Sequence, residues 1–360
     1  MELRDLSFRP RIADALNCST FETIADVLSR NEEQLCGTLK ISAKDAAELV
    51  QACVQVITCS LYPPKTALQL LKDATHCMLS TGDAEIDKVL GGGILSHGIT
   101  EIVGESGTGK TQLCLQFCLT VQFPKELGGL DGGAVYISTN GMFQSKRFNQ
   151  LTNSIKQHYS CMRNKDLTDN VHCVTVYNFE ALRNIVYYQL PVLLSRNNIR
   201  LVIIDTITAV IQDAFKDFRK RATELFCLGA KLKEISDKFN TAVICINQVA
   251  SDALSKEGFY ETLDCDDKEC WNYAQYYKQT LLLGDGTKVP ALGLSWSSII
   301  NTRISLSRPL RTLKETICTM TKDPRVITVI MAPHAPKRAG QFYIENDGLH
   351  GVVCNSKNDI

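Results

Sequence analysis

Residues 104–111 read Gly-Glu-Ser-Gly-Thr-Gly-Lys-Thr, which satisfies the phosphate-loop pattern G-x-x-x-x-G-K-[ST]. An apolar, strand-like run at residues 99–103 precedes it, and a helix-like run begins directly after it. This order lets the backbone N–H groups of the loop and the helix dipole face a phosphate. Lys110 is expected to reach the outer phosphates, and Thr111 to ligate Mg²⁺. The motif therefore predicts that a nucleoside triphosphate binds at Gly104, Glu105, Ser106, Gly107, Thr108, Gly109, Lys110, Thr111 and Gln112.

Three further apolar runs end in polar residues. Residues 201–205 end in Asp205, residues 241–246 lead into Asn247 and Gln248, and residues 133–137 lead into Asn140 through two hydroxyl residues. An aspartate after a buried strand can be a plain loop acid, but beside a phosphate loop Asp205 is expected to hold Mg²⁺ together with Thr111. Helix-like segments separate these runs. We therefore predict an α/β fold with a mainly parallel central sheet that helices cover on both faces.

The first sixty residues have a different pattern from the rest of the chain. Apolar positions recur there at helical spacing, with short polar breaks between the segments. This is typical of a small helical bundle that docks on a partner or on nucleic acid. Tyr62-Pro63-Pro64-Lys65 then interrupts any helix, because proline cannot continue one. The pattern predicts a small all-α domain over residues 1–60, a linker over 61–80 and a core over 81–360.

Composition is that of an ordinary globular protein. The chain has 360 residues, of which 44% are apolar and 22% charged. No apolar stretch reaches the roughly 18 residues of a membrane span, and the N-terminus lacks the apolar core of a signal peptide. The fifteen cysteines are scattered, which favours a reducing compartment. Cys114 and Cys118 are expected in the core, whereas Cys265 and Cys270 are too widely spaced for a zinc site.

The distribution of charge is more informative than the net charge, which is zero. Basic residues gather at 216–221 and again at 303–325, where Arg308, Arg311, Lys314, Lys322 and Arg325 also lie. Each cluster could be a solvated helix face or hairpin, but its position near the nucleotide-binding end favours contact with DNA phosphates. The residues expected to bind DNA are Lys216, Arg219, Lys220, Arg221 and Arg303.

Several motifs carry a resemblance to a known family. Thr81-Gly82-x-x-x-x-Asp87-x-x-Leu90-Gly91-Gly92-Gly93, the phosphate loop ending Gly-Lys-Thr-Gln, residues 201–205 and Asn247-Gln248-Val249 resemble the core of the RecA-like strand-exchange recombinases. The small helical domain is similar to that of the eukaryotic and archaeal branch. Shorter stretches at residues 68–70, 121–130, 191–196 and 332–334 resemble the recombinase paralogues of that branch. The resemblance covers nearly the whole chain and implies a RecA-like P-loop ATPase core.

The resemblance implies roles for individual residues. ATP–Mg²⁺ binding follows from the matching Lys110, Thr111 and Asp205. Gln248 matches the residue that senses the γ-phosphate and begins the second DNA-binding loop, and Arg221 matches an arginine of the first DNA-binding loop. Arg147 falls where the family places an arginine against adenine, and its planar guanidinium suits stacking. A surface arginine on a helix fits the same position equally well.

The chain also departs from the family pattern. Asn140 stands at the position of the catalytic glutamate, and an amide cannot take a proton from water near pH 7. Met331 replaces an aspartate that caps the ATP of the neighbouring subunit, and Pro64 replaces a linker phenylalanine, although Ala67 is kept. The second DNA-binding loop, residues 249–289, is acidic and aromatic, so its rings could stack on bases or pack against a partner protein.

Three classes of function remain open. The first is a nucleotide-gated paralogue with weak ATP hydrolysis, acting within a DNA-repair assembly in the nucleus, with the cytoplasm as a second candidate location. Its partners would be another recombinase paralogue and single-stranded or branched DNA. The main strand-exchange recombinase is a further candidate partner, and no membrane is expected to be involved. The second is a self-polymerising DNA-dependent ATPase, and the third is an ATP-dependent scaffold that does not bind DNA. A GTPase is disfavoured, because Asn164-Lys165-Asp166-Leu167 misplaces the acid that reads guanine.

Overall fold

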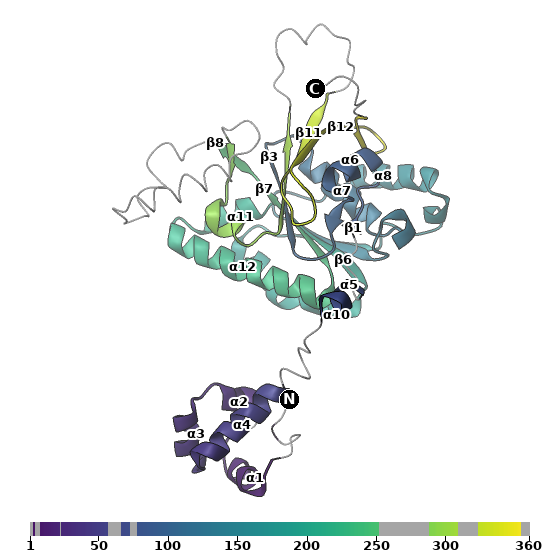
Figure 1. Ribbon diagram of the computed structural model, residues 1–360. Helices are drawn as coiled ribbons and strands as arrows, with labels where there is room; N and C mark the ends of the chain where they lie inside the picture. The colour runs from purple at the N-terminus through teal and green to yellow at the C-terminus, as the bar shows by residue number, and fades with distance from the viewer. Residues whose placement is uncertain are drawn as a thin grey trace. The chain divides into compact units, whose positions relative to one another are not determined.

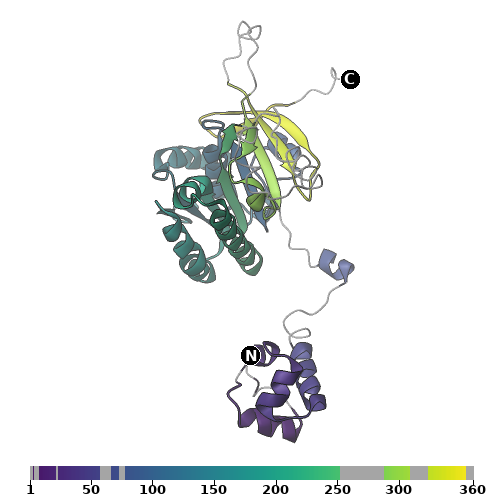
Figure 2. The ribbon, with the colours of Figure 1, turned by 90° about the vertical axis from the view of Figure 1, so that its left-hand side faces the viewer.

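The computed structural model describes residues 3, 8–21, 23–56, 66–72, 78–251, 288–308 and 323–353. The chain divides into two compact units, Met1–Thr75 and His76–Ile360 (Figures 1 and 2). The larger unit begins before the expected end of the linker, because β1 (Met78–Leu79) pairs with β2 (Ile94–Leu95) in antiparallel register. Pro64 lies outside the described residues.

The smaller unit is the helical bundle that the sequence predicts. Side chains cap two of its helices: Thr23 forms a capping box with Asp26, and Asn31 forms one with Gln34. Ile12, Leu35 and Leu49 are fully buried and belong to one apolar core. The helices of this unit are α1 (Pro10–Asn17), α2 (Ile24–Leu28), α3 (Glu32–Leu39), α4 (Ala43–Val56) and α5 (Ala67–Lys72).

The larger unit is built on one large sheet. Over the described residues its strand order is β13-β12-β11-β10-β3-β7-β6-β4-β5. Strands from β10 to β5 in this order pair in parallel, and β11, β12 and β13 extend the sheet in antiparallel fashion. The strands are β3 (Ile99–Gly104), β4 (Gly133–Ser138), β5 (Val171–Thr175), β6 (Ile199–Asp205), β7 (Ala242–Asn247), β10 (Thr302–Ser307), β11 (Arg325–Met331), β12 (Arg338–Ile344) and β13 (Leu349–Gly351).

Helices cover both faces of this sheet, as predicted (Figures 1 and 2). Successive side chains of a strand point to opposite faces, so Leu201 and Ile203 of β6 join one core, and Val202 and Ile204 join the other. The first core is closed by α6 (Ala84–Leu90), α7 (Lys110–Thr120) and α8 (Ser145–His158). The second is closed by α9 (Phe179–Asn184), α10 (Leu190–Arg196), α11 (Ile207–Ala214), α12 (Phe218–Phe239) and α14 (Gly293–Ser297).

The strand order brings distant segments to one edge of the sheet. Because β3, β7, β6 and β4 are adjacent and parallel, the segments that follow them meet at the same carboxyl edge. Strand β10 also runs parallel to β3, and β11 returns from that edge. The phosphate loop, Asn140 and Gln248 follow strands that end there, and Asp205 is the last residue of β6. The fold therefore places one candidate site at this edge.

The segment that the resemblance identifies as the second DNA-binding loop, and the cysteines, lie only partly within the described residues. Strands β8 (Val249–Ser251) and β9 (Lys288–Pro290) pair antiparallel, and the acidic aromatic segment between them lies outside the described residues. Cys114 and Cys118 are fully buried in the first core, as predicted. Cys265 and Cys270 also lie outside the described part of the chain. Within that part, no helix is both long and apolar enough to cross a membrane.

Candidate nucleotide-binding site

The segment from the end of β3 to the start of α7 contains glycines at positions that a larger residue would not fit. Gly109, which precedes the first residue of α7, has φ +105°, a conformation that side chains with a Cβ rarely adopt. A Cβ on Gly104 would lie 2.2 Å from the carbonyl oxygen of Leu306 on the neighbouring strand. The glycines of the motif therefore keep the loop close to the sheet and leave its N–H groups at the N-terminus of α7.

Lys110 folds back over this loop. Its Nζ donates hydrogen bonds to the carbonyl oxygens of Gly104 and Glu105, both at 2.6 Å. Burial lowers the pKa of Lys110, and the nearby carboxylate of Asp205 opposes that shift. The ammonium group is thus held beside the loop by two oxygen acceptors. Phosphate oxygens are acceptors of the same kind and carry negative charge, so the side chain is suited to bind them.

Thr111 and Asp205 meet across the site. Thr111 Oγ1 donates to Asp205 Oδ2 at 2.9 Å, and Tyr136 Oη donates to the same carboxylate oxygen at 2.5 Å. Burial, reinforced by Asp205, raises the pKa of Tyr136 well above its usual range, so the phenol keeps its proton and remains a donor. A hydroxyl and a carboxylate are hard oxygen ligands of the kind that Mg²⁺ prefers. The donor set therefore fits the predicted magnesium site.

These residues line a cavity of about 840 Å³, which is large enough for a nucleotide. Asn140, just beyond β4, and Gln248, just beyond β7, are both exposed on its wall, and Gln112 contributes from α7. The structure thus brings together most of the residues that the sequence predicts for the nucleotide. The lining residues that sequence reasoning missed are Tyr136, Ser138, Met142, Phe143, Gln144, Thr206, Val249, Arg325 and Ile344.

Two predicted residues lie beside the cavity and do not line it. Thr108 is buried, and its Oγ1 donates to the carbonyl oxygen of Glu105 at 2.9 Å, so it shapes the loop. Arg147 donates from Nε to Gln112 Oε1 at 2.7 Å and from its Nη atoms to the carbonyl oxygens of Glu345 and Asn346, at 2.6 and 2.8 Å. It therefore ties α7 to the turn after β12. Stacking of Arg147 on adenine stays a prediction. The flat face of the guanidinium would contact the base, while its N–H groups keep the hydrogen bonds described above.

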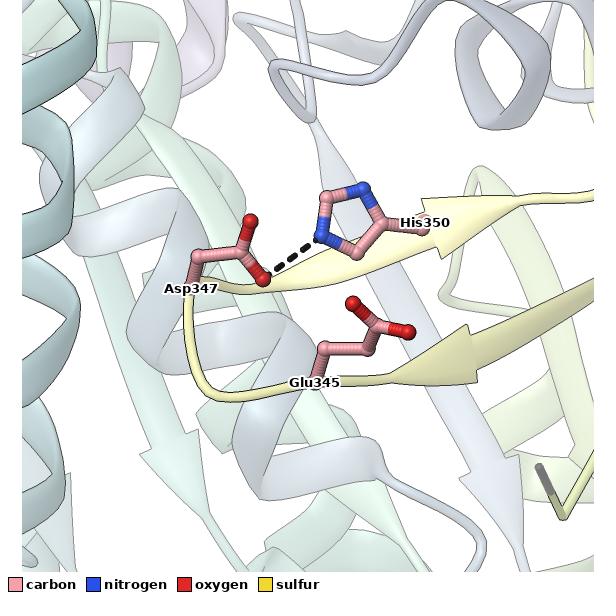
Figure 3. Close-up of side chains that lie close together, drawn as sticks. All are labelled: Glu345, Asp347 and His350. Carbon is pink, nitrogen blue, oxygen red and sulfur yellow. Dashed lines mark hydrogen bonds and ion pairs between the residues drawn. The ribbon is translucent and has the colours of Figure 1, made fainter. Parts of the chain in front are cut away.

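The same turn and the strand after it, β13, hold a second group of possible ligands. Glu345, Asp347 and His350 place one ligand atom each within 4.8 Å of one another (Figure 3). Asp347 Oδ1 accepts from His350 Nε2 at 2.8 Å, and both side chains are more than one-third exposed. Such a hydrogen bond between exposed side chains is common on protein surfaces. This group is separate from the magnesium site predicted at Thr111 and Asp205.

The first basic cluster lies outside the cavity, at the start of α12. Lys216, Arg219 and Lys220 are exposed, and Arg221 is partly buried. Asp217 caps the helix by accepting from the backbone N–H of Arg219 at 2.9 Å. The first turn of this 22-residue helix contains no acidic residue. Cations there face the positive end of the helix dipole, an arrangement that a bound anion would stabilise.

The prediction that Arg303 binds DNA is wrong for this structure. Arg303 is 3% exposed on β10, an inner strand between β3 and β11. Its Nε forms an ion pair with Glu101 of β3, and its Nη2 donates to Ser297 Oγ at 2.7 Å. Glu101 Oε1 in turn accepts from Asn247 Nδ2 at 2.7 Å. The guanidinium is therefore used inside the fold and cannot reach a DNA phosphate.

The rest of the second basic stretch also differs from the prediction. Arg308 donates from Nη2 to the carbonyl oxygen of Gly107 at 3.1 Å, and Arg325 lines the nucleotide cavity. Arg308 and Arg325 thus lie beside the phosphate loop, in contrast to the buried Arg303. The other basic residues of the stretch, Arg311, Lys314 and Lys322, lie outside the described residues.

Comparison with known proteins agrees with this site. The family model described as Rad51 matches residues 72–266. The chain is 29% identical to the DNA repair protein rhp57 of Schizosaccharomyces pombe, over 95% of this chain and 96% of that protein. It is 29% identical to the DNA repair protein XRCC3 of Mus musculus, over 98% of each. It is 30% identical to the meiotic recombination protein DMC1 of Saccharomyces cerevisiae, over 70% of this chain and 74% of that protein. With a family model matching more than half of its length, this chain belongs to the Rad51 family.

Proposed function

We propose that this protein is an ATP- and Mg²⁺-binding recombinase paralogue. It acts in the nucleus as a subunit of a DNA-repair complex that supports homologous recombination at double-strand breaks and stalled forks. The observation that carries the proposal is the phosphate loop, with Lys110 Nζ 2.6 Å from two loop carbonyls and Thr111 2.9 Å from Asp205. The relatives named as DNA repair and meiotic recombination proteins support the biological setting.

ATP and its magnesium ion would be held by groups that the structure places around one cavity. The loop N–H groups and Lys110 would bind the phosphates, and Thr111 and Asp205 would bind Mg²⁺. The bound ion would neutralise phosphate charge. Tyr136 would orient the Asp205 carboxylate through the hydrogen bond to Oδ2. Gln248, exposed on the cavity wall, would report whether the γ-phosphate is present.

ATP hydrolysis by this chain is proposed to be weak. Asn140 occupies the cavity wall just beyond β4, where the family pattern has a glutamate. Its amide can hold a water molecule by a hydrogen bond but cannot accept the proton that an attacking water must lose. ATP binding would then act mainly as a conformational signal.

DNA contact is proposed for the first turn of α12 and not for Arg303. Arg219 and Lys220 are exposed at the positive end of that helix, and Lys216 is exposed just before it. Phosphate contacts by such side chains do not depend on base sequence, and they weaken as salt is added. DNA affinity of the isolated chain is therefore expected to be modest and strongly dependent on salt.

Assembly with another recombinase paralogue is proposed because the self-polymerising pattern is incomplete. Met331, at the end of β11 and 40% exposed, offers no carboxylate to the ATP of a neighbouring subunit. The sequence also lacks the linker phenylalanine, since Pro64 stands in its place. An open head-to-tail interface extends into a filament only when both faces are complementary. A discrete heteromer is therefore favoured over a homopolymer.

The experiment that tests the core of this proposal is a titration of the full chain with labelled ATP, with and without Mg²⁺. Lys110→Ala should weaken binding by about tenfold to a hundredfold, because it removes a charged hydrogen bond to phosphate. Lys125→Ala is the matched control, since Lys125 is exposed and does not line the cavity. Equal ATP affinity of the wild-type chain and Lys110→Ala would contradict ATP binding at this site.

A further inference from the structure

Arg325 is the first residue of β11, and the strand order places it at the same sheet edge as the phosphate loop. A Cβ built on Gly109 of the loop would lie 3.7 Å from Arg325 Cδ, so the arginine stem packs against the residue that precedes α7. Arg325 also lines the cavity that Lys110 and Asp205 share. Its backbone is held by pairing with Phe342 of β12. Arg325 therefore lines the nucleotide cavity from a strand whose backbone is held in place.

The hydrogen bonding of Arg325 is incomplete. Nη1 donates to the carbonyl oxygen of Asp323 at 3.3 Å, which is long for such a bond. Nε is buried and has no hydrogen-bond partner among the described residues. An arginine has five N–H donors, and the edge formed by Nε and one Nη is the one that pairs side-on with a carboxylate or phosphate. A buried donor without a partner is unfavourable, so an anion that reorders this side chain would gain a strong interaction.

The neighbouring arginine differs in this respect. Arg308, just beyond β10, donates from Nη2 to the carbonyl oxygen of Gly107, so it has an acceptor in the loop backbone itself. Arg308 is also exposed and is not part of the cavity wall. Arg308 therefore binds the loop backbone, whereas Arg325 lines the cavity beside the loop.

We propose that Arg325 binds a phosphate group of the nucleotide held by its own chain, as a second fixed cation beside Lys110. The proposal rests on ATP binding at this cavity, as proposed above. A nucleoside triphosphate carries about four negative charges. The cavity wall itself contributes two carboxylates, Glu105 and Asp205. Lys110 and one Mg²⁺ supply three positive charges. Arg325 adds a fourth that stays ionised at all physiological pH values. We expect the guanidinium to contact a phosphate that ADP and ATP both have. The reason is that Arg325 packs at Gly109, next to the start of α7.

The test is nucleotide binding by the full chain carrying Arg325→Gln. Affinity for labelled ATP and for labelled ADP should both fall by about tenfold to a hundredfold, as for loss of a charged hydrogen bond. Competition by inorganic pyrophosphate should weaken by the same factor, because the contact is to phosphate. Arg325→Lys keeps the charge but loses the planar guanidinium, which can pair with two oxygen atoms at once. Its affinities should therefore lie between those of the wild type and Arg325→Gln. Arg338→Gln on the adjacent strand β12, exposed and outside the cavity, should bind as the wild type does.

The outcomes separate this inference from the proposed function. If the wild-type chain binds ATP and Arg325→Gln binds both nucleotides equally well, the inference is overturned while ATP binding stands. Failure of the wild type to bind ATP overturns the proposed function instead. A loss for ATP with unchanged pyrophosphate competition, or a loss of DNA affinity alone, would also overturn the inference. Should Arg325→Gln lack a cooperative thermal transition, Arg325→Lys decides: a loss of about threefold or more supports the contact, and no loss refutes it.

Discussion

Arg303→Met is the substitution that best tests the buried network in the centre of the sheet. Methionine resembles the arginine stem in length and removes the charge. The change leaves the Glu101 carboxylate buried, with a hydrogen bond from Asn247 Nδ2 at 2.7 Å. The two side chains of the ion pair are 4% and 0% exposed, so water cannot replace the lost partner.

The size of the effect follows from this burial. Removing one partner of a buried ion pair costs about 3–5 kcal/mol in the free energy of unfolding, because an uncompensated charge remains. For a domain of this size, such a loss lowers the melting temperature by roughly 5–15 °C. Adding Glu101→Gln removes the stranded charge and keeps an acceptor for Asn247. The double variant should therefore regain at least half of the lost stability.

Thermal and urea unfolding of the full chain, followed by circular dichroism, measures both variants. The transition of the small helical unit serves as an internal control, because the network lies entirely in the larger unit. Below its melting temperature, Arg303→Met should keep the DNA affinity and the salt dependence of the wild type. A loss of stability under about 1 kcal/mol would refute the burial of the pair. A flatter salt dependence of DNA binding with unchanged stability would instead support a contact between Arg303 and DNA.

Three further predictions concern activity and assembly. Asn140→Glu should raise ATP hydrolysis by about a hundredfold if the missing base limits it, measured by phosphate release against Asn153→Glu; an unchanged rate would contradict that cause. The double reversal Arg219→Glu and Lys220→Glu should flatten the salt dependence of DNA binding by about two units of log–log slope, and Lys238→Glu at the other end of α12 should not. Light scattering of the purified chain with ATP and DNA should show no long homopolymers; regular filaments of this chain alone would refute the assembly proposal.

Much of the fold could be read from the sequence because its signals are local. The phosphate loop is set by glycine and lysine spacing within residues 104–111, and the apolar runs that became β4, β6 and β7 are continuous in the sequence. The helical spacing of the first sixty residues likewise needs no distant partner. Because parallel strands order their carboxyl ends along one edge, these local features were enough to predict Lys110, Thr111 and Asp205 as one site.

The nucleotide loop, the α/β class and the helical N-terminal unit could be predicted without coordinates, since each depends on residues close together in the chain. The environment of the basic residues, in contrast, depends on how the strands pair. Arg303 faces inward because β10 pairs with β3, which brings Glu101 from 202 positions earlier in the chain. Arg325 faces the cavity because β11 returns antiparallel from the same edge. Composition marks both as basic, but the orientation of a side chain on a strand is set by the neighbouring strands, and those come from distant parts of the sequence.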